Sequence, residues 1–239
     1  MARAVIPARE RLIFAMDVPD ADSARGLADR LGDAVAFYKI GLELFTAGGS
    51  FELVDWMVGR GKRVFLDLKF FDVPATVAAA VRNLRGRGVT FTTVHGNQAI
   101  MEAAAQAAAG EVGILAVTVL TSLDRGDLDD LGFQCDVGEL VLSRARRALA
   151  AGCAGVISSG LEAKALRAGV DDRLIVVTPG IRPVENRPAD DQKRVVDVAQ
   201  AFANGADYIV VGRPIRDAAD PRAAAEAIQA TIAGIFPGR

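Results

Sequence analysis

The sequence predicts an α/β fold in which residues 1–239 form a single domain, a closed (β/α)8 TIM barrel. Eight apolar runs of strand length alternate strictly with eight segments of helical periodicity. This alternation implies parallel strands joined by crossover helices. A length of 239 residues, without a linker rich in Pro, Gly or Ser, suits one such barrel. A doubly wound open sheet is the alternative.

The predicted strands are short apolar runs, most of them followed by polar residues or glycine. They are expected at residues 12–16, 36–40, 64–68, 91–94, 114–120, 155–158, 174–177 and 208–211. In the segments between them, apolar residues recur three or four positions apart, which gives a helix one face to bury. These helices are expected at residues 22–31, 51–59, 75–85, 99–108, 139–150, 162–168, 195–203 and 223–235.

Composition indicates a small ligand and a reducing compartment. Lys and Arg total 28 against 30 acidic residues, so no excess of positive charge predicts nucleic acid or an anionic membrane as a partner. The two cysteines, Cys135 and Cys153, form no CxxC motif, which fits a cytoplasmic protein better than a secreted one. The apolar run 12–16 is too short for a signal sequence or a membrane span. We therefore expect a cytoplasmic protein.

Two negative observations narrow the chemistry. His95 is the only histidine, which excludes a multi-histidine metal site and leaves little room for a Ser-His-Asp triad. The glycines of residues 59–62, GRGK, do not form a phosphate-binding P-loop, because Trp56 stands where that motif requires glycine.

The most informative stretch is 65–76, FLDLKFFDVPAT, which places Asp67, Lys69 and Asp72 within six positions. Side chains two positions apart on a strand share one face, about 6 to 7 Å apart, so Asp67 and Lys69 are expected to point the same way. An unpaired charge taken out of water costs several kcal/mol, so this pair at the end of an apolar strand indicates mutual pairing or a ligand. A purely structural ion pair is the alternative.

Polar residues or glycine also stand at the ends of the other predicted strands. Active sites of (β/α)8 barrels lie at the carboxyl ends of the strands, so we expect these residues to converge on one pocket. The set consists of Asp17, Lys39, Asp67, Lys69, His95, Thr121, Ser158, Thr178, Gly212 and Arg213. Any one of them taken singly is compatible with a capping or loop role, but the group as a whole favours a shared functional site.

The last two strand ends predict a phosphate site. Strand seven is followed by PGIR, ending at Arg182, and strand eight by Gly212 and Arg213, in the region where such barrels bind phosphate. A guanidinium donates paired hydrogen bonds to phosphate, although a plain turn with a solvated Arg213 is the alternative. The polar segment 183–192 is expected to be a lid that closes on the phosphate. The insertion 122–136, with a short helix expected within 127–133, is assigned no chemistry.

With these residues placed, the sequence resembles the orotidine 5′-phosphate decarboxylase family, bacterial type, over essentially its whole length. FLDLKFFDVPAT resembles the D-x-K-x-x-D signature of that family. MDVP supplies Asp17, FYKIG supplies Lys39, TVLTS supplies Thr121, and PGIR with VVGRPI supplies the phosphate end. Within the predicted lid only Gln192 is carried over from the family.

The resemblance implies decarboxylation of orotidine 5′-monophosphate to uridine 5′-monophosphate and CO2, the last step of de novo pyrimidine biosynthesis, without cofactor or metal. It implies a catalytic network in which Lys69 donates a proton to C6 of the pyrimidine, made of Lys39, Asp67, Lys69 and Asp72. It also implies substrate binding by Asp17, Lys39, Thr76, Thr121, Arg182, Gln192, Gly212 and Arg213. Finally, it implies a homodimer in which Asp72 and Thr76 reach the neighbouring subunit's pocket; a helix-start role for both is the alternative.

Two other classes of function stay open. Metal-using relatives, such as keto-sugar phosphate decarboxylases or hexulose-phosphate synthases, also carry a D-x-K-x-x-D stretch. They require a carboxylate on strand two to bind magnesium, whereas this sequence has Lys39 there and Glu43 several residues beyond. A non-catalytic barrel that binds a phosphorylated metabolite would keep Gly212 and Arg213 but need not keep Lys69 between two aspartates. His95 is interpreted as a structural histidine.

Overall fold

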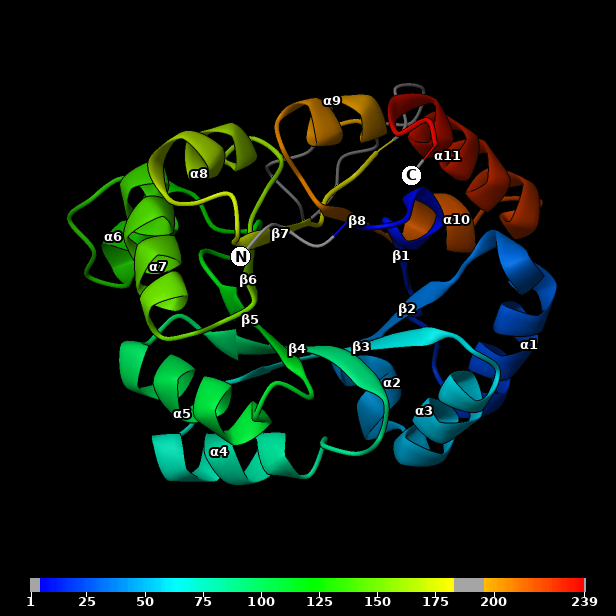
Figure 1. Ribbon diagram of the computed structural model, residues 1–239, viewed down its shortest axis with the longest axis horizontal. Coiled ribbons are helices and arrows are strands. Elements are labelled where there is room, and N and C mark those ends of the chain that lie inside the picture. Colours follow the sequence, from blue (N-terminus) through cyan, green and yellow to red (C-terminus); the bar gives the residue numbers. More distant parts are fainter. Residues whose placement is uncertain (1–4, 183–195, 239) are drawn as a thin grey trace.

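The computed structural model describes residues 5–182 and 196–238, and its eight parallel strands close into a barrel (Figure 1). The strands pair in chain order from β1 to β8, and β8 pairs back to β1 through Leu12 and Ile209, Ile13 and Val210. The predicted (β/α)8 barrel is confirmed, and the doubly wound open sheet is wrong.

All eight predicted strands are present. Their bounds are β1 (Leu12–Ala15), β2 (Phe37–Ile40), β3 (Arg63–Phe70), β4 (Val89–His95), β5 (Gly113–Val117), β6 (Gly155–Ile157), β7 (Ile175–Thr178) and β8 (Tyr208–Val211). The largest differences from the predicted bounds are that β3 runs two residues further, to Phe70, that β4 begins two residues earlier, at Val89, and that β5 stops at Val117 rather than at residue 120.

Helices cover the outside of the barrel (Figure 1). Those in the predicted helical segments are α1 (Ala21–Leu31), α3 (Ser50–Gly59), α4 (Pro74–Arg82), α5 (Gln98–Ala108), α7 (Val137–Ala150), α8 (Ala163–Gly169), α9 (Val198–Ala203) and α11 (Pro221–Ile235). Further short helical elements lie in the connections: η1 (Ala8–Glu10), η2 (Gly32–Ala34), α2 (Leu42–Thr46), α6 (Arg125–Asp130) and α10 (Arg213–Arg216). The sequence predicts a short helix near α6, whereas α2 and α10 are too short to show a period. Among the described helices, none has the length and apolar character that crossing a membrane requires.

Aspartates set the start of several helices. The carboxylates of Asp20, Asp136, Asp197 and Asp220 each accept a hydrogen bond from a backbone N–H of the first helical turn, at 2.7 to 3.0 Å. Such a cap is worth about 1 kcal/mol because it satisfies an N–H that the helix itself leaves unpaired. The caps fix where each helix begins and therefore how long the preceding loop at the barrel rim is.

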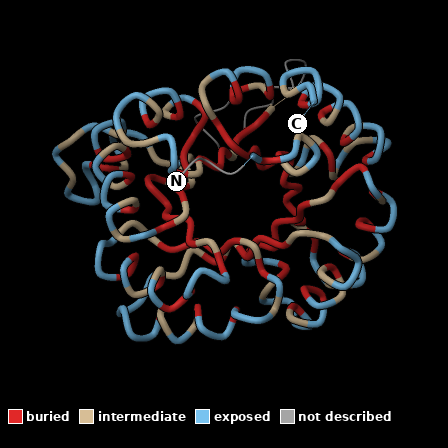
Figure 2. Tube along the Cα trace, in the orientation of Figure 1, coloured by how far each residue is buried: buried red, intermediate tan, exposed pale blue. Residues whose placement is uncertain are grey.

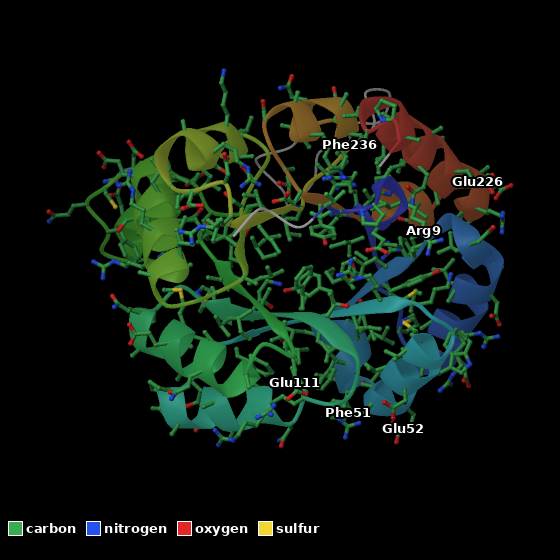
Figure 3. All side chains as sticks on the ribbon, in the orientation of Figure 1. Arg9, Phe51, Glu52, Glu111, Glu226 and Phe236 are labelled. Atoms are coloured by element: carbon green, nitrogen blue, oxygen red, sulfur yellow. The ribbon has the colours of Figure 1, made fainter. Side chains whose placement is uncertain are left out.

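Buried residues form two layers, one between the strands and the helices and one inside the barrel (Figure 2). Side chains fill the space that the ribbon leaves open at the centre (Figure 3). Phe37, Phe91 and Tyr208 contact one another there, with ring centroids 5.6 to 5.8 Å apart. The Arg63 guanidinium lies 4.6 Å from the Phe37 ring and pairs with Glu10. Because these side chains fill the barrel near the amino ends of its strands, space for a ligand remains at the carboxyl ends.

Candidate active site

A cavity of about 240 Å³ opens at the carboxyl ends of the strands. Most of the predicted site residues line it: Asp17, Lys39, Asp67, Lys69, Thr121, Arg182, Gly212 and Arg213. The remaining wall is largely apolar and comes from β1, β3, β5, β6 and β8 and the loops that follow β5 and β7. The cavity thus joins a charged floor to an apolar side, as pockets for small polar ligands do.

Alternation along the strands explains why these side chains meet. Phe37 and Phe65 belong to the interior layer of the barrel, and positions two residues further along face the same way. Lys39 therefore follows Phe37 into the cavity, and Asp67 follows Phe65. The inward-facing residues of β2 and β3 are thus apolar inside the barrel and charged at the carboxyl ends of the strands.

The floor of the cavity is a row of side chains whose charges alternate in sign. Lys39 Nζ lies 3.2 Å from Asp17 Oδ1 and 3.7 Å from Asp67 Oδ2, and Lys69 Nζ lies 2.9 Å from Asp67 Oδ1. The side chains of Lys39 and Asp67 are only 11% and 13% exposed, whereas that of Lys69 is 32% exposed. The predicted pairing of Asp67 with Lys69 is confirmed, and Lys69 is the more accessible of the two ammonium groups.

Asp67 is held in its ionised form. Burial acts to raise its pKa, but the Lys39 and Lys69 ammonium groups, with hydrogen bonds from Lys69 and Thr93, outweigh burial and hold the pKa below its ordinary value. At neutral pH the cavity therefore contains a buried carboxylate between two cations.

Three residues that the sequence interpretation missed support this floor. The Thr93 hydroxyl contacts both the Asp67 carboxylate and the Lys69 backbone N–H, each at 2.9 Å. Gly41 leaves room for Lys39, since a Cβ at Gly41 would lie 3.0 Å from Lys39 Nζ. Arg216 donates to the Asp17 backbone carbonyl at 2.8 Å. The sequence alone singles out none of the three; Thr93, for example, directly follows Thr92 in the same strand.

The predicted phosphate end lies at one side of the cavity. Gly180, Ile181 and Arg182 follow β7, Gly212 and Arg213 follow β8, and all five line the cavity. Arg182 N–H donates to the carbonyl of Val196 at 3.0 Å, so the two ends of the segment that connects them are joined. A Cβ at Gly212 would lie 3.3 Å from that of Ala15, so glycine keeps this wall open. The predicted lid, 183–192 with Gln192, lies outside the described residues.

Asp72 and Thr76 are both exposed and do not line the cavity of their own chain. Asp72 Oδ1 accepts a hydrogen bond from Val73 N–H at 2.6 Å, and Val73 rather than Asp72 is the N-cap residue of α4. Phe71 and Val73, on either side of Asp72, are 69% and 62% exposed. The loop between β3 and α4 therefore presents a carboxylate flanked by two large apolar side chains to its surroundings.

The expectation that every polar strand end would converge on the pocket is wrong for Ser158 and Thr178. Both are buried but do not line the cavity. The preceding residues, Ile157 and Val177, pack with the interior layer. Because successive side chains point to opposite faces, Ser158 and Thr178 face the helices instead.

His95 ends β4 beside the cavity but is not among the residues that line it. Its ring centroid lies 5.1 Å from that of Phe71. Burial first, and then the charges of Arg144 and Lys69, hold its pKa below the ordinary value, so the ring is neutral at neutral pH. His95 thus contacts Phe71 of the exposed loop that carries Asp72 and is near enough to Lys69 to feel its charge.

Comparison with known proteins assigns the chain to one family. Residues 10–228 match the model of the orotidine 5′-phosphate decarboxylase / HUMPS family. The chain is 69% identical over 231 residues to a Methylococcus capsulatus protein named orotidine 5′-phosphate decarboxylase, covering 97% of this chain and 95% of that protein. It is 53% identical to the Stenotrophomonas maltophilia protein of the same name, with all of both chains covered.

Among solved structures, the orotidine 5′-phosphate decarboxylase of Lactobacillus acidophilus superimposes with a TM-score of 0.82 at 35% identity. The match covers 93% of this chain and 99% of that one. The similarity therefore includes the whole barrel rather than one motif.

Proposed function

The chain belongs to the orotidine 5′-phosphate decarboxylase / HUMPS family, and we propose that it decarboxylates orotidine 5′-monophosphate to uridine 5′-monophosphate and CO2, the last step of de novo pyrimidine biosynthesis. The observation that carries the proposal is the Lys39–Asp67–Lys69 cluster on the floor of a cavity that Arg182 and Arg213 also line. A charged reaction centre and a phosphate site are thus combined in one pocket.

The cluster suits a reaction that generates negative charge on carbon. Loss of CO2 leaves an electron pair at C6 of the pyrimidine, and no cofactor is invoked to accept it. Lys69, paired with Asp67 at 2.9 Å and partly open to the cavity, would sit beside C6. Its ammonium offsets the developing charge and then donates the proton that replaces CO2.

Asp67 has a different role in this mechanism. Because it stays ionised, it repels the substrate carboxylate placed next to it. Two like charges about 4 Å apart repel by roughly 4 kcal/mol at an effective dielectric constant of 20. The repulsion is relieved as the carboxylate leaves, while the attraction between Lys69 and the new carbanion grows. Lys39 holds Asp67 in position from the opposite side.

The other lining residues would bind the parts of the substrate that do not react. Arg182, Gly212 and Arg213 take the phosphate, joined by Gln192 from the segment after β7, while Asp17, Lys39 and Thr121 bind the rest of the nucleotide. Binding energy from the phosphate, far from C6, can then be used to align the charged cluster around the reacting carbon.

We further propose that the active form is a homodimer in which Asp72 and Thr76 complete the pocket of the partner subunit. Neither residue reaches the cavity of its own chain. Phe71 and Val73 expose large apolar surfaces on either side of Asp72, and a second subunit seated there would remove that surface from water. In such a dimer Asp72 extends the alternating charges beyond Lys69.

A metal-dependent reaction of the same family is the second candidate, and the position of Lys39 argues against it. Magnesium requires oxygen ligands, whereas here an ammonium group lies between the carboxylates of Asp17 and Asp67. Both carboxylates are thereby paired with ammonium groups of the chain itself, Asp17 with Lys39 and Asp67 with Lys39 and Lys69.

The direct test is to mix the protein with orotidine 5′-monophosphate in the presence of a chelator and follow the loss of the orotate absorbance. Rapid turnover that is unchanged by chelator is expected. Turnover that appears only after magnesium is restored would favour the metal-dependent class, and tight binding without turnover would favour a non-catalytic phosphate-binding barrel.

Replacing Arg213 with alanine should lower kcat/KM for the phosphorylated substrate roughly 10- to 100-fold, because a hydrogen bond to a charged group is worth about 1.5 to 3 kcal/mol. With orotidine, which lacks the phosphate, kcat/KM should be nearly unchanged, since Arg213 then has no ligand group to bind. Steady-state rates with the two substrates measure the difference.

Arg173→Ala is the matched control for Arg213→Ala, because Arg173 is an exposed arginine that pairs with Asp171 on the surface. It should leave both substrates unaffected. Equal losses with both substrates in Arg213→Ala would mean that Arg213 supports the fold rather than the phosphate.

A further inference from the structure

The strand that carries the charged cluster is irregular where the cluster lies. In the pairing of β3 with β4, Leu66 stands opposite Thr92 and Phe70 opposite Val94. Three residues of β3 therefore face a single residue of β4, Thr93. Extra residues on one strand of a pair bend that strand and redirect its side chains, and such bulges occur preferentially beside active sites.

The extra length is accommodated by an uncommon backbone conformation at Lys69, which has a φ of +46°. This region is unfavourable for a residue with a side chain and persists only where its surroundings hold it. Among the described residues, Ala109 at the end of α5 is the other non-glycine residue with positive φ. The residue in the irregular backbone is thus also the proposed proton donor.

Thr93 contacts both the irregular backbone at Lys69 and the carboxylate of Asp67. It is fully buried, and its hydroxyl oxygen accepts a hydrogen bond from Lys69 N–H at 2.9 Å. The same hydroxyl donates to Asp67 Oδ1 at 2.9 Å. One hydroxyl has one proton and two lone pairs, so it can make both bonds at once. It connects the backbone of one catalytic candidate to the carboxylate of the other.

We propose that Thr93 is a positioning residue of the decarboxylation site. Its hydroxyl replaces the backbone carbonyl that would accept the Lys69 N–H hydrogen bond in a regular strand pair. The same hydroxyl fixes the Lys69 backbone and the Asp67 carboxylate relative to each other. The loss of catalysis that this proposal predicts depends on the proposed function. Without the hydroxyl, Lys69 N–H loses this acceptor, and among the described residues Lys39 and Lys69 are the partners that Asp67 keeps. The Lys69 ammonium is then less precisely aimed at C6.

The chain offers a matched control one residue away. Thr92 is also fully buried, and its hydroxyl donates to the Leu66 carbonyl at 2.9 Å, on the opposite face of β4. Thr92→Val and Thr93→Val each remove one buried hydroxyl from the same strand and keep the side-chain shape. They should lower the melting temperature by similar amounts, so a difference in activity between them cannot come from reduced stability.

Thr93→Val should lower kcat about 100-fold, the order of loss expected when a reacting group is misplaced by about 1 Å. KM should change little, because the phosphate end of the pocket is untouched. Thr93→Ser, which restores the hydroxyl, and Thr92→Val should both keep kcat within roughly threefold of the unmodified protein. If Thr93→Val fails to fold, Thr93→Ala tests the same loss without the branched side chain.

The pH profile gives a readout that a purely structural role would not change. Asp67 faces the ammonium groups of Lys39 on β2 and Lys69 on β3, and the Thr93 hydroxyl on β4. Since Thr93 donates to the ionised carboxylate, its removal should raise the pKa of Asp67 and move the acidic limb of kcat/KM to higher pH. Thr92→Val should leave that limb in place.

Two outcomes would overturn the proposal: Thr93→Val and Thr92→Val with the same kcat and the same acidic limb, or Thr93→Ser as slow as Thr93→Val. If the proposed function itself is wrong, the positioning role of Thr93 can still be tested separately. If the unmodified protein does not decarboxylate orotidine 5′-monophosphate, the carboxyl carbon of Asp67 can still be titrated by NMR. A higher pKa in Thr93→Val than in Thr93→Ser supports the positioning role, and equal values exclude it.

Discussion

Lys69→Ala is expected to retain the barrel and lose decarboxylation by roughly 10⁴-fold or more, because one side chain supplies both the proton and the main positive charge beside C6. Removal of a general acid alone typically costs 10²- to 10⁴-fold, and the missing electrostatic stabilisation adds to this. The rate constant for a single turnover, measured with excess enzyme, gives the loss directly.

The fold should tolerate this substitution. Lys69 Nζ projects into the cavity, and Asp67 keeps the Lys39 ammonium and the Thr93 hydroxyl as partners when Lys69 is removed. Lys164→Ala, which removes an exposed lysine from α8, is the control for the removal of one positive charge and should leave turnover unchanged. Substantial residual turnover in Lys69→Ala, with the circular dichroism of the unmodified protein, would assign the proton transfer to another group.

The barrel and most of its pocket were predictable because they follow from periodicity. Strict alternation of strands and helices leads to parallel closure, and parallel closure places all strand ends at one rim. Charged residues at that rim, such as Lys39 and Asp67, are then expected to meet. The cavity contains both of them.

What could not be predicted is the direction of individual side chains. Strands of a parallel barrel are buried on both faces, so their sequences are continuously apolar and do not reveal which positions point inward. A polar residue at a strand end is therefore easily assigned to the pocket, as Ser158 and Thr178 are, although both face the helices. The bulge in β3 is equally invisible, because it depends on how Leu66 and Phe70 pair with β4.

A second limit concerns contacts between chains. Asp72 and Thr76 are site candidates through the resemblance to the family, and their exposed positions on a single chain do not by themselves say what they face. A site shared between subunits makes a sharp prediction, however, since defects in two different chains can then compensate for each other.

Mixing Asp72→Ala subunits with Lys69→Ala subunits should restore activity that neither variant has alone. In the heterodimer one pocket takes Lys69 from one chain and Asp72 from the other and is intact, while the second pocket carries both defects. Two-fold symmetry then predicts about half of the normal activity in the heterodimer, and roughly a quarter in a fully exchanged equal mixture. Activity is followed over time after mixing, and mass-tagged subunits measure the extent of exchange.

The matched control is a mixture of Lys69→Ala with Asp67→Asn. Both residues line the cavity of their own chain, so each pocket of that heterodimer lacks one of them and no activity should return, however complete the exchange. Recovery in the first mixture but not in this one identifies Asp72 as a residue supplied across a subunit boundary. If tagged heterodimers of Asp72→Ala and Lys69→Ala form and remain as inactive as their parents, Asp72 does not act in the partner's pocket, and its bond to Val73 N–H is its whole role.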